Sequence, residues 1–182
     1  MSTAATPSEF VRGRASARPL GLDDLAAMSS PELGALYAGG SVPDSLAAID
    51  GDLVGRMLAV EKLDRGSPRR ALAAFSRGSG FPWAGKSFRA EAAGRGSGVN
   101  RVRLGAAGRH RLFPFETRFG ESVIDARACV VLDYDLTDNP AVIRAIHDEV
   151  RLVTPRVLLG PACWKREGHK PALVLWFALE LP

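Results

Sequence analysis

The sequence has few cysteines and lacks the usual spacing of metal ligands. Two cysteines occur among 182 residues, Cys129 and Cys163, and both lie in apolar stretches. Two thiols are too few for a disulfide framework or a structural zinc site, and an unpaired cysteine is commonly a small buried hydrophobe. Because His-x-x-x-His and Cys-x-x-Cys spacings are also missing, we expect no metal and no other cofactor.

Long apolar runs and strong charge are missing as well. The most apolar stretch, Ala172 to Leu179, is far shorter than the roughly 20 residues of a membrane helix, so we expect no membrane span. Segment 1–18 lacks the apolar core of a secretory signal, which predicts a cytoplasmic location. The net charge of +4 falls short of a dense basic stripe, so we expect no nucleic-acid partner.

What remains is an ordinary globular composition, with 46% hydrophobic residues. We expect a disordered tail over residues 1–20 and one domain over 21–182. Helices are predicted at 22–28, at 67–75, and from Ser30, as N-cap, to Gly39–Gly40, where Pro31 suits the first helical position.

The rest of the domain alternates apolar and polar residues between glycine-rich turns, which predicts strands. Gly55 would permit a bend or a close backbone approach, and Pro114 favours an edge or a bulge. About seven to eight strands suit a small closed barrel, so we predict a mainly β (α+β) fold: an antiparallel lipocalin-like β-barrel with N-terminal helices. The expected strands are 52–60, 86–91, 99–104, 111–117, 128–135, 150–153, 157–164 and 173–181, with a short helix from Asn139 to Ile146.

Residues 80–87, GFPWAGKS, match the G-x-x-x-x-G-K-[ST] pattern of phosphate-binding loops. A true phosphate loop follows a buried strand and opens a helix. Here the preceding residues 71–76 look helical, and Pro82 has no N–H to donate. The alternative is structural: Trp83 and Phe88 would fill one end of a barrel, with Lys86 lying along Trp83. Nucleotide binding at 80–87 is therefore the least favoured of three functional hypotheses.

Several short elements carry a family resemblance. These are Trp83, Gly85, Lys86 and Phe88, then Asp133–Tyr134–Asp135, then Leu159–Gly160, and a last strand that contains Phe177. Together they resemble the GXWXG family of bacterial lipocalin-like proteins over residues 32–181. The resemblance implies a calycin-type antiparallel barrel with a helical lid, and it implies no particular activity.

Two strands carry polar residues whose role depends on whether their side chains face into the barrel or out of it. Asp133 and Asp135 share one face of a strand, with Tyr134 on the other. If the two carboxylates face inward, burial would raise their pKa values and they would suit acid–base chemistry. If they face outward, they would pair with Arg144 or Arg151. The outward arrangement is favoured, because Asp is rarely buried without a partner. Likewise an inward Arg101 would bind an anionic head group, such as a fatty-acid carboxylate.

The first hypothesis is a barrel that binds a small apolar or amphipathic ligand, such as a fatty acid or lipid, in its cavity. The second is a cyclase or isomerase on the same barrel, with Asp133 and Asp135 as catalytic carboxylates and Tyr134 or Arg101 steadying an oxyanion. The sequence leaves open whether the protein is an enzyme. Candidate ligand-binding residues are Met57, Trp83, Lys86, Phe88, Arg101, Phe113, Phe115, Tyr134, Trp164 and Trp176.

Overall fold

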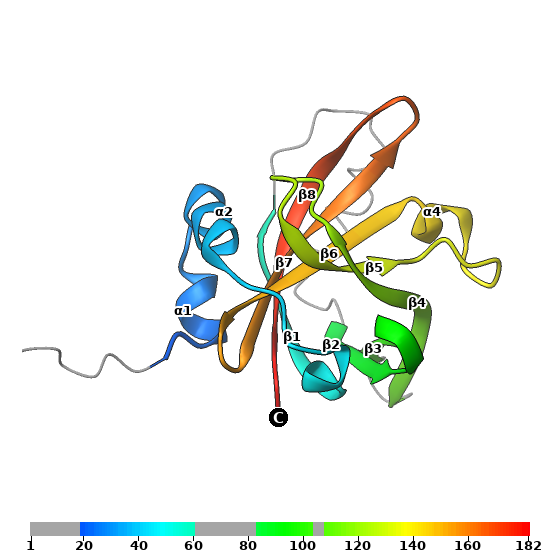
Figure 1. Ribbon diagram of the computed structural model, residues 1–182, viewed down its shortest axis with the longest axis horizontal. Helices are drawn as coiled ribbons and strands as arrows, with labels where there is room; N and C mark the ends of the chain where they lie inside the picture. Colours follow the sequence, from blue (N-terminus) through cyan, green and yellow to red (C-terminus); the bar gives the residue numbers. More distant parts are fainter. Residues whose placement is uncertain (1–18, 61–82, 104–107) are drawn as a thin grey trace, which may run out of the picture.

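Eight antiparallel strands close into a barrel (Figure 1). The computed structural model describes residues 19–60, 83–103 and 108–182. Each strand pairs with the next along the chain, and the last returns to the first. The predicted antiparallel barrel is thereby confirmed. The strands are β1 Gly51–Val60, β2 Trp83–Ala90, β3 Arg95–Arg103, β4 Arg109–Glu121, β5 Ala128–Asp133, β6 Ile146–Thr154, β7 Val157–Arg166 and β8 His169–Glu180.

Successive side chains of strand β8 point to opposite faces of the sheet and enter two separate apolar clusters. Leu175, Phe177 and Leu179 point into the barrel, where they join the main apolar cluster. Trp176 and Ala178 point outward and belong to a second cluster beneath the helices. Both faces of β8 are therefore buried, which explains why its sequence reads as one apolar run instead of alternating.

Two N-terminal helices cover the outside of the barrel: the first packs against β1 and β8, and the second against β6 and β7. They are α1 Leu22–Ala26 and α2 Ser30–Gly39, and Figure 1 shows both on one side of the barrel. The Trp176 ring lies 5.5 Å from the ring of Tyr37 in α2, and its Nε1 donates to Ser30 Oγ at 3.0 Å. The helix is capped one residue earlier than predicted: the backbone N–H and hydroxyl of Ser29 both bond to the Glu32 carboxylate.

The two ends of the barrel are closed differently. The short 3₁₀ helix η1, Leu46–Ile49, leads into β1, and its Leu46 and Ile49 pack into the interior cluster. A second short 3₁₀ helix, η2 Ala92–Gly94, links β2 to β3. Helix α4, Ala141–Arg144, precedes β6 at the opposite end, because successive strands of this barrel run in opposite directions. Leu46 and Ile49 therefore fill the interior at the η1 end, whereas Ile143 of α4 packs against the same cluster from the other end.

Irregular pairing in β2 changes which side chains face inward. The register shifts between Trp83 and Gly85, so Trp83 and Lys86 both face the interior although they are three residues apart. A Cβ on Gly85, whose φ is +126°, would lie 2.0 Å from the Leu53 carbonyl oxygen. A Cβ on Gly55 would lie 2.5 Å from Gly85 Cα, which confirms the predicted close approach. The bulge beside Pro114 is confirmed as well, because the β3–β4 register shifts there.

The predicted helix from Asn139 to Ile146 is too long. Helix α4 ends at Arg144, and Ile146 already pairs with Trp164 as the first residue of β6. The hydrogen bond from Lys165 N to Ala145 O, at 2.8 Å, begins this ladder and ends the helix. Consequently Asp148 and Glu149 are strand residues on opposite faces of the sheet.

The second half of the GFPWAGKS motif also has a different context from a phosphate loop. Residues Trp83 to Ser87 open strand β2, whereas a phosphate loop opens a helix. The predicted tail up to residue 18, the helix at 67–75 and residues 80–82 lie outside the described residues. Among the helices that the structure describes, none is long and apolar enough to cross a membrane.

Candidate functional site

A cavity of about 100 Å³ lies inside the barrel, near the end that carries α4. Most of its wall is apolar, and its polar atoms come from a few side chains on β2, β3 and β6 and from Tyr134, directly after β5. Concave apolar sites with a few fixed polar groups are typical of small-molecule binding. The lining residues are Met57, Trp83, Lys86, Asn100, Val102, Phe113, Tyr134, Ile143, Ile146, Asp148, Ala162, Leu175 and Phe177.

The polar part of the wall is centred on Lys86. Its side chain is 4% exposed, and its Nζ lies 2.9 Å from Asn100 Oδ1, 2.5 Å from Tyr134 OH and 3.0 Å from Asp148 Oδ2. An ammonium group has three protons, and here three acceptors surround it. We call Lys86, Asn100, Tyr134 and Asp148 the inner cluster.

The other members of the inner cluster hold one another in place. Asn100 Oδ1 also accepts from Trp83 Nε1 at 3.0 Å, while its Nδ2 donates to Phe113 O and Tyr134 OH, each at 3.2 Å. The Tyr134 hydroxyl donates in turn to Asp148 Oδ2 at 3.0 Å. These bonds use every donor of Asn100 and Tyr134.

The surroundings of Lys86 oppose its charge in one way and support it in another. Burial holds the pKa of Lys86 below its ordinary value, and the Asp148 carboxylate opposes this shift only in part. Four aromatic rings, those of Trp83, Phe115, Tyr134 and Phe177, lie 5.1 to 5.5 Å from Nζ, within the range of cation–π attraction. Burial also raises the pKa of Tyr134 well above its ordinary value, so its hydroxyl stays protonated as a donor.

Only one of the two carboxylate oxygens of Asp148 has hydrogen-bond partners in the described part of the chain. Oδ2 accepts from Lys86 and Tyr134, but Oδ1 is buried and has no hydrogen-bond partner among the residues that the structure describes. The side chain is 6% exposed and lines the cavity. Buried carboxylate oxygens are nearly always hydrogen-bonded, so Oδ1 is the open position of the inner cluster.

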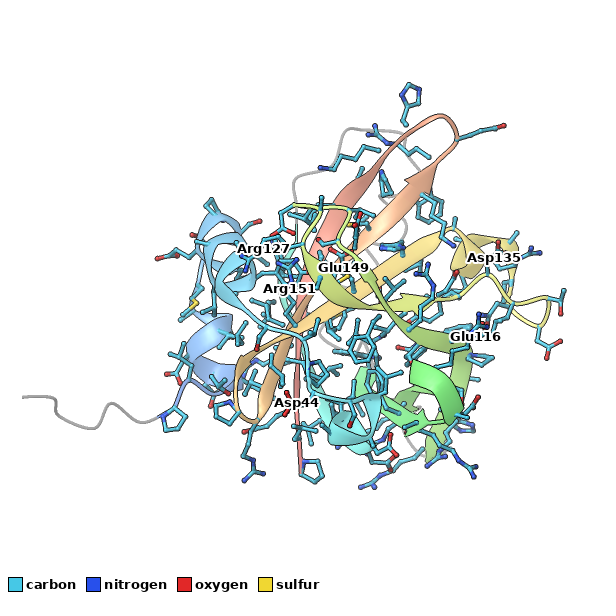
Figure 2. All side chains as sticks on the ribbon, in the orientation of Figure 1. Asp44, Glu116, Arg127, Asp135, Glu149 and Arg151 are labelled. Atoms are coloured by element: carbon cyan, nitrogen blue, oxygen red, sulfur yellow. The ribbon has the colours of Figure 1, made fainter. Side chains whose placement is uncertain are left out.

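A second polar cluster lies beneath α2, on the outer face of β6, the strand that carries Asp148. We call Tyr37, Ser122, Asp125, Glu149 and Arg151 the outer cluster; Figure 2 shows Glu149 and Arg151 near α2, with Arg127 beside them. Glu149 accepts from Tyr37 OH at 3.0 Å, from Ser122 Oγ, and from Val123 N at 3.0 Å. Arg151 binds both oxygens of Asp125 at 2.7 and 2.8 Å.

The structure brings most predicted ligand-binding residues together. Met57, Trp83, Lys86, Phe113 and Tyr134 line the cavity. Phe88 and Phe115 lie in the interior cluster, with rings 5.4 Å apart, and Phe115 contacts Tyr134.

Three predicted ligand-binding residues lie elsewhere. Trp176 is on the outer face against α2, because the period of β8 turns it away from Phe177. Arg101 also points outward, where it donates to Leu53 O at 3.1 Å and pairs with Asp52 at 3.7 Å. Trp164, half-buried where β7 pairs with Ile146, is not part of the lining.

The two predicted catalytic carboxylates lie outside the cavity and pair with cations. Asp133 Oδ1 accepts from Lys165 Nζ at 3.0 Å, and Asp135 Oδ1 from Arg144 Nε at 2.7 Å. Figure 2 shows Asp135 beside α4, on the far side from Glu149. This is the outward arrangement that the sequence favoured. Arg144 pairs with Asp135 as predicted, whereas Asp133 pairs with Lys165, and the other predicted partner, Arg151, pairs with Asp125.

Asn100 and Asp148 are the two members of the inner cluster that are absent from the predicted site residues. Asp148 follows the predicted helix, and no local pattern joins it to Lys86, which lies 62 residues earlier. One signal was available: Asp148, Val150 and Leu152 follow a period of two, and the last two contribute to the interior. Extending the strand back from Val150 would have pointed Asp148 inward.

Comparisons with known proteins support the fold alone. No family model and no curated protein matches the sequence. A crystal structure of a protein from Thermomonospora curvata is similar, with a TM-score of 0.51 and 18% sequence identity over 85% of this chain and 88% of that one. At this identity the similarity extends to the barrel architecture.

Proposed function

We propose that this barrel binds a small apolar or amphipathic molecule in its cavity. The observation that carries the proposal is an apolar cavity wall with a buried polar cluster, formed inside a closed sheet. The class includes fatty-acid- or lipid-like molecules whose apolar part would occupy the cavity. The up-and-down eight-stranded topology also supports the proposed kinship with the GXWXG lipocalin-like proteins.

The size of the cavity limits what can enter. At about 100 Å³ it is smaller than the roughly 150 Å³ apolar cavity that binds benzene in an engineered protein. Pockets that enclose drug-sized ligands measure about 300 to 1,000 Å³. The pocket is open on one side, so a single ring, a short chain, or the end of a longer molecule can enter while part of the ligand lies outside this volume.

The same geometry gives less support to the other two hypotheses. The Lys86 ammonium is bound by three protein acceptors, so no proton remains for a phosphate. Acid–base chemistry by Asp133 and Asp135 would need them in the cavity, and both lie outside it. Binding thus remains the function that the described residues support best.

A matched pair of variants tests the proposal. Val102→Phe puts a ring into the cavity, whereas Val54→Phe makes the same change at a position that is 53% exposed on the outside of β1. Phenol and toluene are titrated into each protein and followed by ligand-observed NMR. We expect both probes to bind the native chain and the Val54→Phe variant, and to lose measurable affinity for the Val102→Phe variant.

Native mass spectrometry of the purified protein complements this titration, because a retained apolar molecule would identify a ligand directly. Thermal melts of both variants establish that each is folded. If neither probe binds the native chain, or if Val102→Phe binds both as well as Val54→Phe does, the proposal fails.

A further inference from the structure

The cavity offers a ligand one specific hydrogen-bonding position. Asp148 Oδ1 is buried, belongs to a side chain that lines the cavity, and has no partner among the described residues. The other oxygen of the same carboxylate is bound twice, by Lys86 and Tyr134. A buried acceptor without a donor is unfavourable, so a ligand that supplies the donor gains affinity.

We propose that the cavity selects neutral ligands carrying a hydroxyl or N–H group, which donates to Asp148 Oδ1 while an apolar ring or chain fills the remaining space. This inference rests on the proposed binding function and adds the chemical class of the group that the site recognises. It assigns Asp148 a role in specificity in addition to its pairing with Lys86.

An anionic group does not fit this site. All three protons of the Lys86 ammonium are directed at Asn100, Tyr134 and Asp148. Its charge is already balanced by Asp148 at 3.0 Å. A ligand carboxylate would therefore meet the free carboxylate oxygen of Asp148 without a cation to spare, which is repulsive in a buried site.

A cationic group fits poorly for the complementary reason. The ammonium and the carboxylate together make the inner cluster neutral, so a ligand ammonium would bring an unbalanced charge into an apolar cavity. It would also approach Lys86, which shares the same carboxylate. Neutral donors avoid both penalties.

A group that only accepts hydrogen bonds finds no donor here. The donors of Asn100 are used by Phe113 O and Tyr134 OH, and the Tyr134 hydroxyl is used by Asp148. The Trp83 indole N–H donates to Asn100. Among the described polar groups of the lining, the open position is thus an acceptor, and it calls for a donor.

The test compares pairs of probes with the same shape. Phenol and toluene differ by O–H against CH₃, while anisole and ethylbenzene differ by an ether oxygen against CH₂. We expect the native chain to bind phenol about tenfold to a hundredfold more tightly than toluene, since hydrogen bonds to charged groups are the stronger ones. Anisole should bind no better than ethylbenzene, and benzoate should bind less tightly than phenol. Calorimetric or NMR titration measures each constant.

A double variant assigns the preference to Asp148. In Lys86→Met with Asp148→Asn the charges are removed together, which keeps the buried site neutral. The new amide oxygen can accept from Tyr134, leaving the amide N–H₂ as the open group. The preference should then reverse, so that anisole binds more tightly than ethylbenzene and phenol loses its advantage over toluene. Asp135→Asn, a matched change at an exposed position, should keep the native preference.

The outcomes separate the two proposals. Equal binding of phenol and toluene to the native chain would overturn the donor inference and leave ligand binding intact. A phenol preference that persists in the folded double variant would overturn the role of Asp148. Binding of neither probe would overturn both proposals together.

Discussion

Two buried polar clusters sit back to back on β6, and they differ in how completely they are satisfied. Asp148 turns into the barrel and Glu149 turns out toward α2. In the outer cluster both oxygens of Glu149 are bound, and Arg151 directs all five of its donors at protein oxygens. In the inner cluster one carboxylate oxygen remains open.

This difference separates a structural role from a binding role. The outer cluster joins α2, the β4–β5 connection and β6, so every bond it makes is between parts of the chain. The inner cluster is equally buried, but its open oxygen belongs to a side chain that lines the cavity. Burial and charge alone would not distinguish the two; the count of unmet hydrogen bonds does.

The largest effect is expected from breaking the inner ion pair on one side. Lys86→Met would leave the Asp148 carboxylate buried without its cation, which costs about 3 to 5 kcal/mol of unfolding free energy. Adding Asp148→Asn to the same chain should recover most of that loss, because the uncompensated charge is gone. Urea unfolding of the two proteins measures the difference; equal losses would show that the charge is not what matters.

A smaller effect is expected when the outer cluster is titrated with acid. The hydrogen bond from Arg151 lowers the pKa of Asp125 from 3.8 to about 2 in the folded protein. A lowered folded-state pKa stabilises the fold above the unfolded value, and this contribution is lost as pH falls through 3.8 toward about 2. We expect a loss of about 1 kcal/mol after allowing for solvent screening of this partly exposed carboxyl.

The matched control for this titration is Asp125→Asn, which removes the group. Unfolding free energies at pH 6 and pH 3 should differ less in this variant than in the native chain. If both proteins lose the same stability between these pH values, other carboxyls determine the acid response.

The smallest effect is expected at the surface. Asp135→Asn removes an exposed ion pair with Arg144, and such pairs contribute roughly 0 to 1 kcal/mol. Phenol affinity should stay unchanged, because this side chain lies outside the cavity. A large loss of affinity in this variant would bring the carboxylates after β5 back into consideration as functional groups.

Much of the barrel could be predicted from local patterns. Alternation and glycine-rich turns located all eight strands, and the opposite directions of Tyr134 and Asp133 followed from the strand period. Strand ends were placed less well, because pairing with a neighbour extends a strand beyond its local propensity. The helix that begins after Pro140 ends before Ile146, because Ile146 pairs with Trp164 as part of β6.

The inner cluster could not be predicted in the same way. Lys86 and Asp148 meet only because the barrel closes, and their distance along the chain leaves no local signal. Lys86 also faces inward together with Trp83 only because the bulge before Gly85 resets the period of β2. The family resemblance drew attention to Trp83, Gly85 and Lys86, but it named no partner for the lysine.

The seam between β1 and β8 has a consequence for how the barrel forms. It joins residues far apart in the chain, such as Met57 and Phe177, whereas the pairings from β2 to β8 join strands adjacent in sequence. Such a long-range contact carries the greatest loop-closure entropy of the sheet, so the seam is expected to close late in folding. Met57, Leu175 and Phe177 beside this seam also line the cavity. A ligand that binds there binds only the closed barrel, so by mass action it stabilises the β1–β8 pairing that forms late in folding.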